Sequence, residues 1–255
     1  MFERLKERAE SFLAQNQPAI DALGRLDVSF DDAMVKTSNI VVTYPPKQVL
    51  EDRTTENFHL PSTDKPKALY IHIPFCTGIC NYCAFERTAN SAGDPQIAKY
   101  VDLLSSESKL VRQSMGGKRI PVESIYIGGG TPTLLPPEQL EKLFDIIARD
   151  YELRAGSEYT LEGSPETLIE DGTEKLKLAQ QYSVNRVSIG IESFDDPTLK
   201  ALNRRHDAEM AERVIHIIKN AGINNIDIDL IRGLPQSSAD HIINNLQKAA
   251  QRGTV

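Results

Sequence analysis

The three cysteines of the 255-residue chain all lie within one short motif: Cys76, Cys80 and Cys83. Cysteine thiolate is a soft ligand that suits zinc or an iron–sulfur cluster. A structural zinc site needs four ligands, and His72, the nearest candidate for a fourth, sits on an expected strand that directs it away from the loop. A cubane cluster held by three cysteines leaves one iron free to bind a substrate or cofactor. The spacing therefore favours a cluster over zinc and over inert core cysteines.

A glycine-rich turn, Gly-Gly-Gly-Thr-Pro at 128–132, is a second candidate for chemistry. Glycine lets a backbone approach a ligand without a Cβ clash, and the turn leaves N–H and C=O groups free for that ligand. Alone, the same residues describe a tight turn between a strand and a helix. The turn gains a ligand-binding interpretation from the cysteine motif that precedes it.

Charged residues stand near the ends of other apolar runs. A carboxylate buried at Glu162 would be costly without a cationic or hydroxyl partner; a solvated strand end is the alternative. Strand alternation places Asp227 and Asp229 on one face. In a barrel the inward face holds the site, so Asp229 is a candidate ribose or second-cofactor contact; a structural salt bridge is the alternative. Arg204 is either a ligand-binding or a surface residue. Four histidines look like surface or helix positions without a role: His59, His206, His216 and His241.

The elements that must position these residues begin at about residue 68. Five apolar runs rich in Ile, Val and Tyr alternate with helical patterns of apolar residues. Strands that alternate with helices form βα units and a parallel sheet, which can curl into a full or partial barrel. The active site of such a barrel lies at the carboxyl ends of its strands, where the candidate residues above are expected to gather.

The chain is expected to have two parts. Residues 1–66 form an N-terminal extension with one amphipathic helix near 2–23 and a polar linker, and residues 67–255 form the α/β core. Gly253 is typical of a helix C-cap, and Thr254-Val255 looks like the start of another strand. The core is therefore expected to be incomplete at its C-terminus, as the front part of a longer protein.

Composition limits the classes of partner and location. The formal net charge is −7 and no basic stripe is present, which argues against nucleic-acid binding. No apolar run approaches the ~20 residues of a membrane helix, and the charged N-terminus does not resemble a signal peptide. An odd number of cysteines in one cluster does not suggest disulfides, so a reducing, cytoplasmic location is the expectation.

The segment Tyr-Ile-His-Ile-Pro-Phe-Cys-x3-Cys-x-Tyr-Cys at 70–83 resembles the radical SAM superfamily, and more closely its oxygen-independent coproporphyrinogen III oxidase-like group. YIGGGTPTLL, LEGSPET, NRVSIGIESF, LNRRH and DIDLIRGLP follow in family order, so the resemblance runs from about Lys67 to Arg252. It implies a partial (β/α)6-type TIM barrel, of which five βα units are present. It also implies two cofactors, a 4Fe-4S cluster on the three cysteines and S-adenosylmethionine.

The resemblance also implies which residues bind S-adenosylmethionine. The glycine turn would contact its amino group, and Arg204 would face its carboxylate, where a guanidinium fork suits bidentate pairing. Glu192 occupies a position where several relatives carry glutamine. The full set of implied cofactor contacts is Tyr70, Gly129, Gly130, Thr131, Glu162, Glu192, Arg204 and Asp229.

Three activities are open within this group: oxidative decarboxylation of coproporphyrinogen, radical methyl transfer or cyclopropanation with a second S-adenosylmethionine (class C), and non-catalytic heme binding and delivery. The implied substrate is a small tetrapyrrole or aromatic molecule, and the implied partner is a reductant such as flavodoxin or ferredoxin. The decarboxylase carries a fourth cysteine two residues after the third, where this chain has Phe85. That departure brings the chain nearer to the methyltransferase and heme-chaperone relatives.

Overall fold

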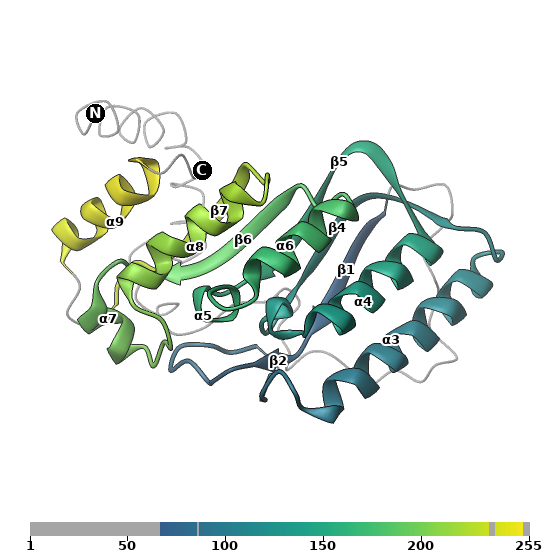
Figure 1. The fold of residues 1–255 in the computed structure, drawn as a ribbon, viewed down its shortest axis with the longest axis horizontal. Coiled ribbons are helices and arrows are strands. Elements are labelled where there is room, and N and C mark those ends of the chain that lie inside the picture. The colour runs from purple at the N-terminus through teal and green to yellow at the C-terminus, as the bar shows by residue number, and fades with distance from the viewer. Residues whose placement is uncertain (1–66, 86, 235–237, 252–255) are drawn as a thin grey trace, which may run out of the picture. The chain divides into compact units, whose positions relative to one another are not determined.

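A computed structural model of the chain describes residues 67–85, 87–234 and 238–251 (Figure 1). The expected helix near 2–23, the polar linker up to residue 66 and the expected strand start at 254–255 lie outside the described residues. The proposed division into residues 1–66 and 67–255 therefore stays a prediction.

The core is a sheet of five strands, all paired in parallel. Its strands are β1 (Ala68–Ile73), β4 (Ile120–Gly129), β5 (Tyr151–Gly163), β6 (Arg186–Glu192) and β7 (Asn225–Leu230). Their order in the sheet is β1-β4-β5-β6-β7, the order of the chain, so β1 and β7 stand at opposite edges of this open sheet. The α/β class, the five βα units and the partial barrel predicted from the sequence are confirmed.

A helix follows each strand of this sheet, and the first four of these helices return the chain to the start of the next strand. These helices are α3 (Pro95–Ser114), α4 (Pro137–Asp150), α6 (Gly172–Gln181), α8 (Ala208–Asn220) and α9 (Ala239–Gln251). Figure 1 shows α3, α4, α6 and α8 in succession along one side of the sheet, each packed on the next. Aspartates cap two of them: Asp94 accepts from Gln96 N at 2.8 Å, and Asp207 from Met210 N at 2.8 Å.

Alternation along the strands divides the sheet into two chemically different faces. The residues that pack against the helices are apolar and buried; they include Ile125, Ile127, Leu161, Val187 and Ile189. The residues between them carry most of the polar and titratable groups of the strands. The core therefore lies between the sheet and its helices, and the opposite face is left to the functional groups.

A second, two-stranded sheet encloses the cysteine motif. Its strands, β2 (Phe75–Cys76) and β3 (Thr88–Ala89), run parallel and were not predicted from the sequence. Two further bonds extend the pairing: Thr88 N donates to Pro74 O at 2.8 Å, and Asn90 N donates to Cys76 O at 2.8 Å. Two residues are too few for a hydrophobic pattern to reveal a strand.

Within the described residues, no helix combines the length and the apolar character that a bilayer crossing requires.

Candidate functional site

The three cysteines lie on one loop at the carboxyl end of β1, and all three are free thiols that are partly buried. We call residues 76–83 the cysteine loop. Cys83 N donates to Cys80 O at 3.3 Å, which makes a turn between the second and third cysteine. Across the described part of the chain, no three His, Cys, Asp or Glu side chains are arranged around one metal position. A donor set of three soft sulfurs on one short loop fits an iron–sulfur cluster.

The glycine turn packs directly on the start of the cysteine loop. Gly130 N donates to Ile73 O and Thr131 N to Phe75 O, both at 2.7 Å. A Cβ added at Gly130 would lie 2.7 Å from Phe75 O and 3.0 Å from Cys76 Sγ, so only glycine allows this approach. Burial raises the pKa of the Cys76 thiol, and a hydrogen bond from the Thr131 hydroxyl, 3.7 Å from Sγ, opposes that rise. The turn therefore supports the first cysteine. The expectation that its N–H groups are free for a ligand is wrong for Gly129, Gly130 and Thr131, because all three donate within the protein.

Glu162 occupies the space that Gly128 leaves open. Its Oε2 accepts a hydrogen bond from Gly129 N at 3.1 Å, and a Cβ on Gly128 would collide with the same oxygen. Burial raises the pKa of Glu162 to about 7, the Gly129 N–H opposes this rise, and the charges of Asp229 and Glu192 add to it. The cationic or hydroxyl partner that we expected is replaced by a backbone N–H.

Aromatic and histidine rings lie next to this carboxylate. The Tyr70 hydroxyl is 3.0 Å from His72 Nδ1, and the Tyr70 and Tyr126 rings stack with centroids 6.0 Å apart. Gly129 has φ +117°, and a Cβ there would lie 2.5 Å from His72 Nδ1. Tyr70 is 55% exposed, so its ring presents a surface to a ligand rather than being enclosed in the core.

Asp227 and Asp229 of β7 lie on one face, as alternation predicted, and the register of the sheet places Glu162 on the same face. Arg186 forms an ion pair with Asp227, and Ser188 Oγ donates to Asp229 Oδ2 at 3.4 Å. Burial raises the pKa of Asp229, and the charge of Asp227 adds to the rise. Asp229 thus keeps one weak hydroxyl partner, while Asp227 takes the structural ion pair.

Arg204 is held beside the second cysteine. Its Nη2 donates to Gly190 O, and its Nη1 lies 3.4 Å from Cys80 Sγ and 3.7 Å from Glu192 Oε1. The side chain is 10% exposed, which excludes the surface alternative. Its Nε is buried and has no hydrogen-bond partner. A buried guanidinium with a spare donor fits the binding of an anionic group at this position.

Glu192 is turned toward the cysteine loop by its backbone. It has φ +65°, a left-handed conformation that is rare for a residue with a side chain, and it follows a register shift between β6 and β7. Its Oε1 accepts a hydrogen bond from the Tyr82 hydroxyl at 2.7 Å. Burial raises the pKa of Glu192, and the bond from Tyr82 and the charge of Arg204 oppose the rise. Glu192 therefore ties the end of β6 to the residue just before Cys83.

The segment after the short helix α7 (Asp196–Ala201) holds the outer part of the cysteine loop. Asn203 Nδ2 donates to Ile79 O at 2.7 Å, and Asn81 N donates to Leu202 O at 3.1 Å. A Cβ on Gly78 would lie 2.6 Å from Arg205 Nε. The LNRRH residues thus act as a platform for the loop, in addition to supplying Arg204.

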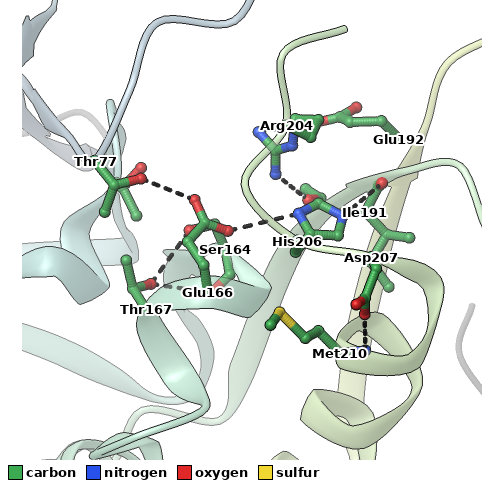
Figure 2. A network of polar contacts seen from close by, with 12 residues as sticks. Thr77, Ser164, Glu166, Thr167, Ile191, Glu192, Arg204, His206, Asp207 and Met210 are labelled. Atoms are coloured by element: carbon green, nitrogen blue, oxygen red, sulfur yellow. Dashed lines mark hydrogen bonds and ion pairs between the residues drawn. The ribbon is translucent and has the colours of Figure 1, made fainter. Parts of the chain in front are cut away.

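Two residues of this site were assigned no role from the sequence: Glu166 and His206. The prediction that His206 is a surface or helix position is wrong, because its side chain is fully buried between strand ends. Figure 2 shows Glu166 between Thr77 and His206. Burial alone would raise the pKa of Glu166, but the contact with His206 and the charge of Arg204 lower it to about 2. The signal available in the sequence was that His206 lies two residues after Arg204.

Comparison with known proteins places this site in a family. A family model described as the radical SAM superfamily matches residues 70–249. Oxygen-independent coproporphyrinogen III oxidase of Bradyrhizobium diazoefficiens is 36% identical over 182 residues, which cover 71% of this chain and 39% of that protein. Heme chaperone HemW of Lactococcus lactis is 36% identical over 184 residues, which cover 72% of this chain and 46% of that protein.

The fold is also found among solved structures. Coproporphyrinogen III oxidase from Escherichia coli, described as a radical SAM enzyme, matches with a TM-score of 0.64 and 22% identity, over 89% of this chain and 46% of that chain. The chain therefore spans less than half the length of each of these relatives.

Proposed function

Because the chain belongs to the radical SAM superfamily, we propose that it carries the cofactor-binding core of a radical SAM protein of the coproporphyrinogen III oxidase-like group. The cofactors of this family are a 4Fe-4S cluster and S-adenosylmethionine. The observation that carries the proposal is the loop of three free cysteines beside the buried guanidinium of Arg204. When bound, the cluster supplies the electron that cleaves S-adenosylmethionine into methionine and a 5′-deoxyadenosyl radical, which takes a hydrogen atom from the substrate.

Different residues are proposed to bind the cluster and S-adenosylmethionine. Cys76, Cys80 and Cys83 would hold the cluster through their three thiolates. Arg204 would offer its spare donor to the carboxylate of S-adenosylmethionine. The backbone carbonyl oxygens of Gly129, Gly130 and Thr131 would accept hydrogen bonds from its amino group. Tyr70, Glu162, Glu192 and Asp229 complete the proposed cofactor contacts on the same face.

Reconstitution tests the proposal. The protein is loaded anaerobically with iron and sulfide, reduced with dithionite and given S-adenosylmethionine, and 5′-deoxyadenosine and S-adenosylhomocysteine are quantified. Alanine at Cys76, Cys80 or Cys83 is expected to abolish both the brown chromophore and the cleavage. Reactions without dithionite serve as the control. A variant that keeps chromophore and cleavage would overturn the proposal.

Heme delivery is a second candidate, favoured by the residue at position 85. Phe85 stands where the decarboxylase group carries a fourth cysteine, it is 63% exposed, and a heme chaperone is among the relatives at 36% identity. 5′-Deoxyadenosine alone supports a radical oxidoreductase, and both products together support methyl transfer. An intact cluster that yields neither, in a protein that binds added hemin, supports the chaperone.

A further inference from the structure

Glu166 connects the cysteine loop to the end of β6 through buried polar contacts. It lies on the short helix α5 (Pro165–Leu168) that follows β5, 89 residues away from its partner Thr77. The Thr77 hydroxyl donates to Glu166 Oε1 at 3.0 Å, and His206 Nδ1 lies 3.5 Å from Glu166 Oε2 (Figure 2). Thr77 directly follows Cys76, so this carboxylate contacts the loop next to the first cysteine.

The contacts continue beyond His206. The other ring nitrogen of His206, Nε2, lies 3.2 Å from the carbonyl oxygen of Ile191 and donates to it. Ile191 directly precedes Glu192, whose carboxylate accepts from Tyr82 on the far side of Cys80. Two hydroxyl–carboxylate hydrogen bonds thus hold the cysteine loop, Thr77–Glu166 before Cys80 and Tyr82–Glu192 after it. His206 lies between them, because it contacts the Glu166 side chain and the backbone next to Glu192.

The network is largely buried, and its contact between Glu166 Oε2 and His206 Nδ1 at 3.5 Å is electrostatic, because neither atom has a hydrogen-bond partner. The Glu166 side chain is 16% exposed and that of His206 is fully buried. A carboxylate removed from water is costly unless its partners are fixed in place. Conversely, the loss of one partner leaves the other buried and unsatisfied, so the geometry of the network is strongly constrained.

We propose that Glu166 is a positioning residue that, through Thr77 and His206, fixes the cysteine loop relative to Arg204 and Glu192. The carboxylate acts on the loop without touching the cysteines. The inference rests on the proposed function only in assigning the loop to a cluster; the contacts that hold the loop are independent of that assignment.

The first test measures the loop in the protein before it is loaded with iron and sulfide. Iodoacetamide alkylation of Cys76, Cys80 and Cys83 is followed at each residue by mass spectrometry. Glu166→Gln and Thr77→Val are each expected to speed alkylation about tenfold, because Thr77→Val removes a hydrogen bond to a charged group and Glu166→Gln removes the charge that strengthens it. Thr77→Ser keeps the hydroxyl and is expected to react at the wild-type rate.

The matched control is Glu170→Gln, four residues further on at an exposed position. It removes the same charge without touching the loop and is expected to alkylate as the wild type does. The double variant Thr77→Val/Glu166→Gln is expected to react no faster than Thr77→Val alone, because both changes act on the same bond. The proposal would be overturned if Thr77→Val alkylated at the wild-type rate. It would also be overturned if the increase in alkylation rate in the double variant equalled the product of the two single increases.

The second test uses the reconstituted protein. The loss of cluster absorbance to an iron chelator is expected to be about tenfold faster in Glu166→Gln and Thr77→Val, in line with the usual effect of residues that orient metal ligands. If Glu166→Gln does not fold, Thr77→Val against Thr77→Ser decides, because Thr77 is a partly exposed loop residue. A wild type that takes up no cluster would contradict the proposed function, whereas the alkylation rates would still test the role of Glu166.

Discussion

Leu161 and Glu162 are neighbours on β5, yet they lie on opposite faces of the sheet in opposite environments. Leu161 is fully buried in the apolar core between sheet and helices. Glu162 has one backbone N–H as its hydrogen-bond donor, and burial raises its pKa to about 7. The helix-covered face thus stabilises the fold, whereas the opposite face keeps titratable groups in unfavourable surroundings, as functional sites commonly do.

The largest effect is expected on the helix-covered face. Leu161→Ala removes a fully buried side chain and leaves a cavity, and is expected to lower the free energy of unfolding by about 2–5 kcal/mol. Urea unfolding of the unloaded protein measures this loss. Leu103→Ala, at a position 58% exposed on α3, is the control and is expected to change stability by less than about 0.5 kcal/mol. Equal losses in the two variants would remove the distinction between core and surface.

An intermediate effect is expected at Glu162, and it depends on pH. The pKa of Glu162 is about 7 in the folded chain against an ordinary value of 4.5, so the folded state binds more protons between these values. The free energy of unfolding of the wild type therefore falls as the pH rises from about 4.5 to 7. Glu162→Gln does not titrate, so its stability relative to the wild type is expected to rise by about 1–3 kcal/mol over that interval.

Urea unfolding at pH 5, 6, 7 and 8 measures this dependence. Glu152→Gln, at an exposed position on the same strand, provides the control, and its difference from the wild type is expected to stay flat. A flat difference for Glu162→Gln as well would mean that the carboxylate is better solvated than its position indicates.

The smallest effect on stability, with a clear effect on binding, is expected at Arg204. Arg204→Lys keeps the charge, but an ammonium cannot bond Gly190 O and a carboxylate with the fork geometry of a guanidinium. The Kd for S-adenosylmethionine is expected to rise about tenfold, equivalent to about 1.4 kcal/mol. Anaerobic titration of the reconstituted protein gives the Kd. Arg213→Lys, at an exposed position on α8, is the control; the same Kd in wild type and Arg204→Lys would remove Arg204 from the cofactor site.

Hydrophobic periodicity was sufficient to predict the main elements of the fold. The five strands and their following helices are long enough to show alternation or a helical stripe, and the motif residues fall at the strand ends where a parallel sheet gathers them. The alternation at Asp227 and Asp229 likewise predicted their common face. The pair β2–β3 was missed because its strands have two residues each.

Contacts between distant residues could not be predicted from local pattern. Glu166 meets Thr77 across 89 positions, and Tyr82 meets Glu192 across 110. His206 looked like a surface histidine because nothing in its neighbourhood signals burial, whereas the fold encloses it between α5 and the end of β6. Such pairs depend on how strand ends meet in space, which one sequence does not reveal.

The separation in sequence between the cysteine loop and its platform has a consequence for biosynthesis. The hydrogen bond from Asn203 to the Ile79 carbonyl can form only after another 124 residues have been synthesised. At about 5–20 residues per second, a ribosome needs roughly 6–25 s to cover that distance. During this interval the nascent chain carries three thiols without the segment that later orders them. A cluster bound as proposed would therefore meet a fully ordered loop only after β6, α7 and the segment that follows α7 have been synthesised.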